Sequence, residues 1–379
     1  MSRGTTPYHA QPRHAFWRDA IARVEPDAID PVVNFALQVD SHTKIATAGS
    51  CFAQHIARNL VRHGFSYHVA EPAHPLLSKQ QIEQYNYGTF SARYGNIYTS
   101  RQLLQLFLRA YGEFDPVDDC WFDSEHACWI DPFRPNIQPE GFSSREELLL
   151  DRQQHFAAVR SLFESLDVFV FTLGLTELWS HRQDGAAYPL CPGVAGGQYD
   201  PTLHAFENLS VAQVVADMRE FLVRLRIVNP ASRVILTVSP VPLIATGTQT
   251  HVLCATTYSK SVLRVAAETL VHDVAGVHYF PSYEIITSNA SRGRYYAADC
   301  RDVTEEGVAH VMRLFFQHVA GGAVAGAGAS AAGATTASPQ AQHFLDKSQQ
   351  VVDTICEESL IEQVVAARPP EPGKLGALT

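Results

Sequence analysis

Positive charge is scarce in this chain of 379 residues. It has 29 Lys and Arg residues against 39 Asp and Glu residues, which gives a formal net charge of −10 at pH 7. A protein that follows nucleic-acid phosphates needs a basic face, because its affinity comes from neutralising phosphate charge. The deficit of positive charge therefore argues against a nucleic-acid partner.

Long apolar runs and metal-binding spacings are also missing. No run of about 18 apolar residues occurs and residues 1–13 are polar, so we expect neither a membrane span nor a secretory leader. The seven cysteines include no Cys-x-x-Cys pair, and the seventeen histidines include no His-Glu-x-x-His motif. This pattern predicts a cytoplasmic protein with reduced thiols and with neither a metal nor another cofactor.

Strand and helix patterns alternate along the chain, and 46% of its residues are hydrophobic. Short β-rich runs predict five strands, at 44–48, 66–70, 168–173, 233–238 and 277–280. Apolar residues at helical spacing predict helices after Ser50, around 156–166, over 211–225 and over 308–315, with His310 on the solvent side of the last one. Alternation with short connections is typical of a parallel sheet covered on both faces, the three-layer α/β/α class.

Two changes in composition divide the chain. Residues 76–152 interrupt the alternation, and we interpret them as an insertion after the second strand that decorates the sheet. The Gly/Ala-rich residues 321–342 predict a flexible linker, and helical periodicity returns in 343–379. We therefore expect an α/β domain over 1–320 and a helical tail after the linker. An exposed apolar stripe on that tail would suit contact with a partner or a second copy.

Polar residues follow the predicted strands at the edge where an open parallel sheet binds ligands. Ser50 lies between the first strand and a helix, where the helix dipole favours developing negative charge, although serine is also a preferred helix N-cap. Thr176 and Glu177 follow the third strand, where they either contribute to an oxyanion site or begin a helical turn. The other polar candidates at this edge are His251, Lys260, Asp299 and Asp302.

A run of five residues, Gly49-Ser50-Cys51-Phe52-Ala53, resembles the motif that gives the GSCFA family its name. Further blocks agree in order: Asn86-Tyr87-Gly88-Thr89-Phe90, Arg93-Tyr94-Gly95-Asn96, Gly174-Leu175-Thr176-Glu177 and Tyr258-Ser259-Lys260-Ser261. This order is similar to that of the SGNH hydrolase superfamily. The resemblance implies a flavodoxin-like sheet with strand order 2-1-3-4-5, whose switch point lies between the two strands that Ser50 and Thr176 follow.

The resemblance to SGNH enzymes also implies roles for the block residues. Ser50 takes the position of the nucleophile. Either Gly88 or Gly95 takes that of the second-block oxyanion donor, and Asn96 adjoins the latter as a substrate contact. Thr176 stands where SGNH enzymes have Asn, so a hydroxyl replaces an amide donor there.

The expected catalytic base is the largest departure from the SGNH pattern. Asp299 matches the Asp of the final Asp-x-x-His block, but Asp302 occupies the His position. Asp302 either acts as a base or caps the last helix, and capping is our interpretation. We expect His251 to serve as base or substrate contact, with Asp299 as orienter and the Lys260 charge stabilising an oxyanion; the alternative is that His251 is an ordinary exposed loop residue.

The leading functional hypothesis is a Ser-dependent acyl-ester hydrolase or acyltransferase that forms an acyl-enzyme. Its substrate would be a small-molecule ester or an acylated glycan. The alternative is an SGNH-like protein that binds a glycan or an acyl ligand and has lost its base.

Overall fold

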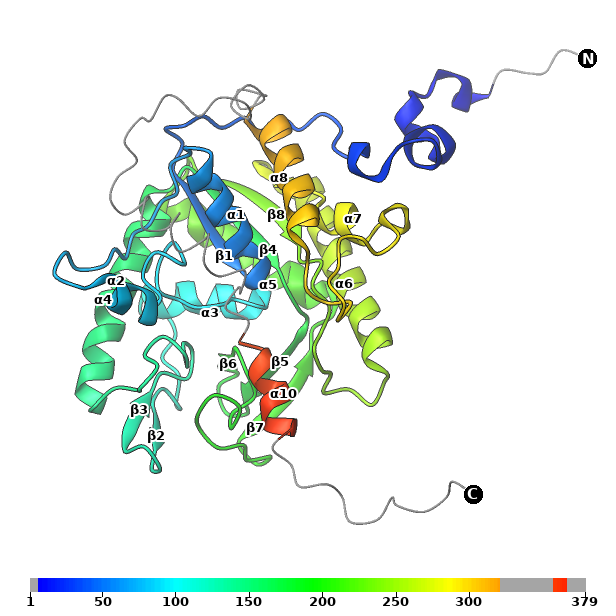
Figure 1. Cartoon of the computed structure of the whole chain (residues 1–379). Coiled ribbons are helices and arrows are strands. Elements are labelled where there is room, and N and C mark those ends of the chain that lie inside the picture. The colour runs from blue at the N-terminus through cyan, green and yellow to red at the C-terminus, as the bar shows by residue number, and fades with distance from the viewer. Residues whose placement is uncertain (1–5, 321–356, 367–379) are drawn as a thin grey trace, which may run out of the picture.

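A parallel four-stranded sheet forms the centre of the protein, whose computed structural model describes residues 6–320 and 357–366 (Figure 1). The strands are β1 (Ile45–Gly49), β4 (Val168–Leu173), β8 (Arg233–Val238) and β9 (Val277–Tyr279), in the spatial order β1-β4-β8-β9. Gly49 pairs with Thr172, so β1 and β4 end side by side. Every residue of β1 and β4 is buried, as expected for strands covered on both faces.

Helices cover both faces of this sheet and bury two separate apolar clusters. One face packs on α1 (Cys51–Arg62), α7 (Ser282–Thr287) and α8 (Glu305–Val319) through residues such as Phe52 and Phe315. The other face packs on α3 (Ser100–Ala110), α4 (Arg145–Ser165), α5 (Val211–Val228) and α6 (Val252–Asp273). The three-layer α/β/α arrangement predicted from the sequence is therefore confirmed.

The second predicted strand, 66–70, is reduced to one parallel bridge. Tyr67 pairs with Ile45 alone, next to β1 and on the side away from β4. The segment leaves the sheet because the Ala70 N–H donates to the carbonyl of Ser91, 2.7 Å away, instead of extending the ladder. The prediction of a strand there was wrong, although the order of the other four agrees with the expected topology.

The insertion contains α2 (Lys79–Gln84), the hairpin of β2 (Trp121–Asp123) and β3 (Cys128–Ile130), and α3. Contrary to the prediction of a purely decorating segment, α3 belongs to the central core, because Leu103 and Phe107 are buried in it. Its N-terminus is a capping box of Thr99 and Gln102, a signal that the sequence carried.

Buried ion pairs tie the rest of the insertion to α4. Arg134 contacts Asp131 at 3.0 Å and Asp151 at 2.7 Å, and Arg93 reaches the same Asp151 at 3.0 Å. Burial alone would raise the pKa of Asp131, but the arginines around it hold that pKa well below its usual range. Removing one partner of such a network leaves an uncompensated buried charge, so the insertion is anchored to the domain.

Two more segments differ from the sequence-based expectation. Residues after Thr176 form no helical turn but β5 (Glu177–His181), which pairs with β6 (Ala187–Tyr188) and β7 (His204–Asn208) in a small antiparallel sheet. Lys260 lies inside the long helix α6, which the sequence patterns did not predict. Both corrections matter for the site described below.

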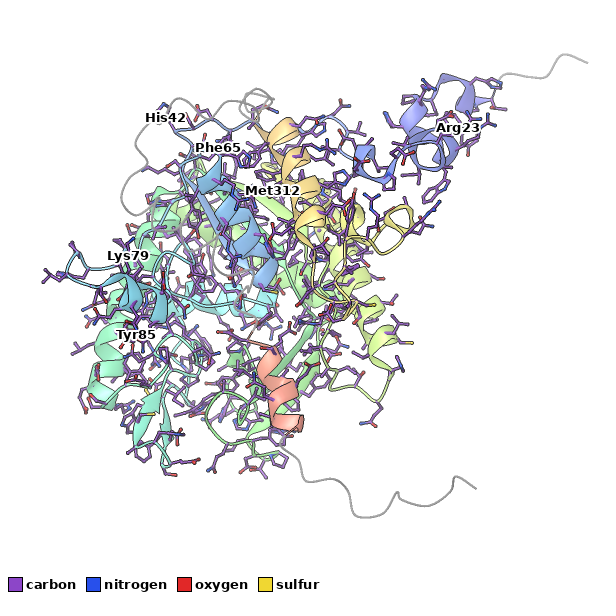
Figure 2. The ribbon with its side chains drawn as sticks, in the orientation of Figure 1. Arg23, His42, Phe65, Lys79, Tyr85 and Met312 are labelled. Atoms are coloured by element: carbon purple, nitrogen blue, oxygen red, sulfur yellow. The ribbon has the colours of Figure 1, made fainter. Side chains whose placement is uncertain are left out.

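His310 is a third position where the structure differs from the sequence-based expectation, because the N-terminal part of the chain covers it. Short turns η1 (Pro7–Ala10), η2 (Arg13–Ala15), η3 (Arg18–Ala22) and η4 (Pro26–Ala28) precede β1, and η5 (Asn289–Ser291) follows α7. Arg23 lies in the part that extends away from the layered body, whereas Met312 of α8 lies on it (Figure 2). His310, predicted to face solvent, is buried because its ring contacts the Tyr295 hydroxyl at 2.8 Å and the carbonyl of Ile29 at 2.9 Å.

The C-terminal region is described only in part. The predicted linker 321–342 and most of the predicted tail 343–379 lie outside the described residues, but residues 357–366 include helix α10 (Ser359–Ala366), red in Figure 1. In the described ranges no helix combines the length and apolar character needed to cross a membrane.

Candidate functional site

Ser50 follows β1 directly and precedes α1, at the carboxyl end of the central sheet. It occupies the N-cap position with an extended backbone, yet its side chain makes no capping hydrogen bond. The residue is 4% exposed, and its Oγ has no hydrogen-bond partner among the described residues. A buried hydroxyl without a partner costs about 1–3 kcal/mol, so this geometry favours a functional over a capping role.

Gly49 positions Ser50 by allowing β1 to approach β4 very closely. Its φ is +143°, and a Cβ atom built there would lie 2.5 Å from the carbonyl oxygen of Thr172. Backbone atoms of a central strand cannot move away from such a clash. Glycine is therefore required at this position.

Replacement of Gly49 by alanine should lower the free energy of unfolding by about 2–3 kcal/mol, because it adds a steric clash to an unfavourable backbone conformation. Gly64→Ala is the matched control: Gly64 also has a positive φ, +75°, but a Cβ there meets nothing within 4 Å. The control should lose only about 1 kcal/mol from its left-handed backbone. Chemical denaturation measures both values, and equal losses would show that the contact with Thr172 is unimportant.

Gly174, the residue after β4, links Ser50 to a buried lysine. A Cβ built on Gly174 would lie 3.2 Å from the Cβ of Ser50, so the two strand ends are in close contact. The Gly174 N–H donates to the carbonyl of Tyr98 at 3.1 Å, and its own carbonyl accepts a hydrogen bond from Lys260 Nζ at 2.7 Å. The Lys260 amine is therefore held at the residue that packs against Ser50.

Lys260 is 1% exposed, an unusual environment for an ammonium group. Burial lowers its pKa to about 8, against the attraction of Glu358 and Cys51, and the positive charge of Arg301 lowers it further. A lysine with such a pKa is partly neutral at physiological pH. It can then accept a proton as well as stabilise negative charge.

The segment that contains Gly95 also reaches the end of β1. The Ile97 N–H donates to the carbonyl of Gly49 at 2.9 Å, and the buried Asn96 accepts from Gln54 of α1 at 3.2 Å. Gly95 adopts a φ of +71°. These hydrogen bonds bring the segment that directly follows Gly95 to the end of β1, next to Ser50, and so favour Gly95 of the two glycines that the sequence left open.

Thr176 and Glu177 hold the loops around this edge of the sheet. The buried Thr176 donates its hydroxyl proton to Asn208 Oδ1 at 2.7 Å, and its N–H donates to Ser259 Oγ at 3.1 Å. Glu177 accepts from the hydroxyl of Thr246 at 2.6 Å and from the N–H of residue 247 at 2.9 Å. With its one hydroxyl proton used in this way, Thr176 connects β4 to β7 and α6.

His251 lies at the N-terminus of α6, where its exposed side chain accepts from the N–H of Leu253 at 3.2 Å. Lys260 lies nine positions further along the chain, which corresponds to about 13 Å of helical rise. This placement corresponds to the alternative stated above, an exposed histidine, and it makes Lys260 the better candidate for a base beside Ser50.

Asp299 and Asp302 both lie at the surface before α8. Asp299 Oδ1 accepts from the N–H groups of Arg301 at 3.0 Å and Asp302 at 3.1 Å, and the Asp302 side chain is 70% exposed. The interpretation of Asp302 as the helix cap was wrong. Thr304 caps α8 instead, because its hydroxyl accepts from the Gly307 N–H and the helix begins one residue later, at Glu305.

Comparison with protein families shows which family the chain belongs to. The model of the GSCFA family matches residues 44–315, which include β1, Ser50, Lys260 and Arg301. The chain belongs to the GSCFA family. A search of curated proteins found no match.

Sequence reasoning missed two residues of the site: Arg301, inside the range of the GSCFA match, and Glu358, beyond its end. Arg301 has a side chain only 13% exposed, and its Nη2 lies 2.8 Å from Glu358 Oε2. Arg301 stood between two predicted site residues, so its charge was the available signal. Glu358 had no such signal, because it is 57 residues away and just precedes α10.

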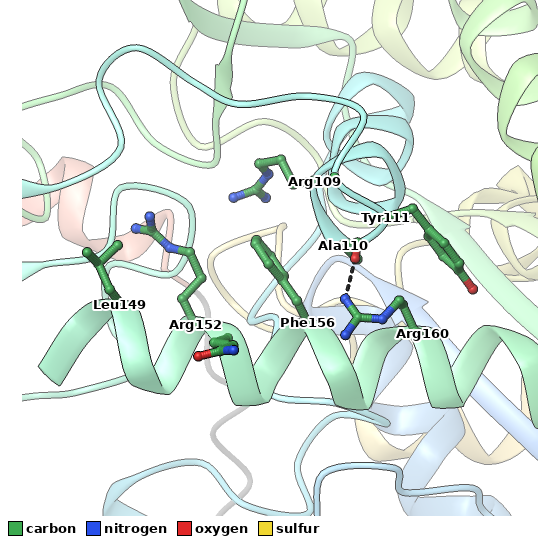
Figure 3. Close-up of a pocket in the computed structure, with 9 residues that line it drawn as sticks. Arg109, Ala110, Tyr111, Leu149, Arg152, Phe156 and Arg160 are labelled. Atoms are coloured by element: carbon green, nitrogen blue, oxygen red, sulfur yellow. Dashed lines mark hydrogen bonds between the residues drawn. The ribbon is translucent and has the colours of Figure 1, made fainter. Parts of the chain in front are cut away.

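The GSCFA chain also has a pocket of about 500 Å³ between α3 and α4, whose lining does not include Ser50 (Figure 3). Its arginines are already engaged: Arg160 donates to the carbonyl of Ala110, and Arg152 contacts Asp119 at 2.8 Å. Arg109 lies over the ring of Phe133, 3.8 Å from its centroid. The pocket therefore offers no nucleophile and few uncommitted charges. Across the described residues, no group of three or more His, Cys, Asp and Glu side chains is arranged to hold a metal ion.

Proposed function

We propose that this GSCFA protein is a Ser-dependent acyl-ester hydrolase or acyltransferase that works through an acyl-enzyme, as SGNH enzymes do. The observation that carries the proposal is the buried Ser50 hydroxyl, which lacks a hydrogen-bond partner among the described residues and lies at the carboxyl end of the sheet. Gly174 packs against Ser50 and binds Lys260, which supports an activated nucleophile.

In this mechanism the neutral Lys260 amine takes the Ser50 proton while Oγ forms a bond to the acyl carbon. Collapse of the tetrahedral intermediate breaks the ester C–O bond, and the Lys260 ammonium returns the proton to the leaving alcohol. Water or an acceptor alcohol then attacks the acyl-enzyme by the same proton path. The positive N-terminal end of α1 favours the oxyanion, and the backbone around Gly95 supplies candidate donors.

Small esters and esterified glycans are the proposed substrates, with the cytoplasm as the proposed location because the cysteines of the described ranges are free thiols. The second candidate function is binding of a glycan or an acyl ligand without turnover. It is favoured by the surface position of Asp302, which leaves no acidic or histidine base at the SGNH position.

Labelling with a fluorophosphonate probe separates the two functions. The probe reacts covalently with activated serines, so the hydrolase should be labelled on the peptide that contains Ser50, and mass spectrometry should locate the adduct there. A protein that remains unlabelled between pH 7 and 9, while folded by circular dichroism, would contradict the hydrolase and favour the binding function.

A further inference from the structure

Two carboxylates of the C-terminal segment are buried in the domain. Glu357 and Glu358 directly precede α10, and each is 6% exposed, whereas Glu362 on the same helix is exposed. Burial of a carboxylate is unfavourable unless positive charge or hydrogen-bond donors compensate it. The partners of these two residues therefore indicate what the segment binds.

The partners of both carboxylates belong to the Ser50 site. Arg301 donates from Nη2 to Glu358 Oε2 at 2.8 Å, and the same glutamate is the main attractive charge on Lys260. Glu357 Oε1 lies 3.5 Å from the position that a Cβ on Gly95 would occupy. One short segment thus binds Arg301, acts on the charge of Lys260 and approaches the backbone at Gly95.

The cations and the carboxylates come from different parts of the chain. Lys260 and Arg301 lie within residues 44–315, the range of the GSCFA match, whereas Glu358 lies beyond it. Asp302 also lies near Arg301, at 3.7 Å, but its side chain is 70% exposed, where solvent screens its charge. Glu358, from a separate segment, therefore supplies buried negative charge to two poorly hydrated cations of the domain.

We propose that Lys260 and Arg301 form a carboxylate-binding subsite beside Ser50, which Glu358 of the chain's own C-terminal segment occupies until an acidic substrate replaces it. This inference rests on the proposed function only where it describes the incoming carboxylate as a substrate. The existence of the binding subsite does not depend on that function. A substrate of this kind is an ester whose acyl or alcohol part carries a carboxylate. Release of the segment would then accompany binding of that substrate.

Hydrogen–deuterium exchange of residues 357–366 in the full chain tests the subsite without any need for turnover. Succinate is the probe, and 1,4-butanediol, of equal carbon length but uncharged, is its control. Because a hydrogen bond to a charged group contributes about 1.5–3 kcal/mol, saturating succinate should speed exchange of this segment about tenfold or more. The diol should leave exchange unchanged.

Substitution of the segment provides an independent arm of the same experiment. Glu358→Gln should speed exchange of residues 357–366 about tenfold without added succinate, while Glu362→Gln, on the exposed side of α10, should not. Unchanged exchange in the rest of the domain checks the fold. The subsite is refuted if succinate acts no differently from the diol, or if Glu358→Gln exchanges like the unsubstituted protein.

Failure of the subsite and failure of the hydrolase give different results. Displacement of the segment by succinate without fluorophosphonate labelling at Ser50 would support the subsite and contradict the enzyme. Labelling at Ser50 with no response of the segment to succinate would support the enzyme and overturn the subsite.

Discussion

Ser50→Ala should abolish fluorophosphonate labelling and lower hydrolysis of p-nitrophenyl acetate by about a thousandfold or more, because the acyl-enzyme cannot form without Oγ. The free energy of unfolding should rise by about 1–3 kcal/mol, because the substitution removes a buried hydroxyl that makes no hydrogen bond within the described structure. Thermal denaturation and steady-state rates measure the two effects.

Ser282→Ala is the matched control for this experiment. Ser282 is the first residue of α7, is fully buried, and also has an Oγ without a hydrogen-bond partner in the described part of the chain. Its removal tests whether loss of any buried hydroxyl disturbs the protein, and it should leave hydrolysis unchanged. If Ser50→Ala keeps its turnover while folded, or if both variants lose it equally, the nucleophile assignment is wrong.

The rate of labelling at Ser50 should rise with pH and level off near pH 8. Only neutral Lys260 can accept the serine proton, and burial lowers the pKa of this lysine to about 8, with Arg301 acting in the same direction and Glu358 and Cys51 opposing it. Below pH 8 the neutral fraction falls tenfold for each unit, so the rate should fall with the same slope. Labelling rates between pH 6 and 10 give this profile.

Lys260→Arg and Lys260→Met should each lower the plateau by about a hundredfold and remove its slope, because neither side chain can exchange a proton near pH 8. Lys79→Arg, at an exposed position of α2, is the control and should retain both the plateau rate and the pH slope. Two substitutions of different charge guard against a folding defect specific to either one. A midpoint near 6.5 that persists in both variants would instead assign the proton to a histidine.

The titration of Lys260 should also make the stability of the fold depend on pH. The pKa of Lys260 is lower in the folded protein than its ordinary value of 10.5, so the unfolded chain binds more protons between pH 8 and 10.5. The contribution of Lys260 to stability therefore increases as the pH rises through this interval. Below pH 8 the folded protein carries a buried charge, whose compensation comes partly from Glu358.

Local sequence patterns were sufficient to predict the layered arrangement, but they did not predict the long helix α6 or the place of α3 in the core. Strands buried on both faces must be apolar throughout, so β1, β4, β8 and β9 were recognisable as short apolar runs, and α1 and α8 by their apolar stripes. The same patterns failed at 66–70, where hydrogen bonding to the insertion ends the strand, and at His310, which the N-terminal segment covers. Both failures arise where a distant segment changes the environment of a correctly periodic run.

The sequence by itself also determined the position of Ser50, because a residue between a buried strand and the helix that follows it lies at the carboxyl edge of the sheet. Only the tertiary structure decided which charged groups lie at this edge of the sheet. Lys260 reaches Gly174 across 86 residues, and Glu358 reaches Arg301 across 57. Such pairings depend on how helices and the C-terminal segment pack in space, and no local spacing of residues specifies that packing.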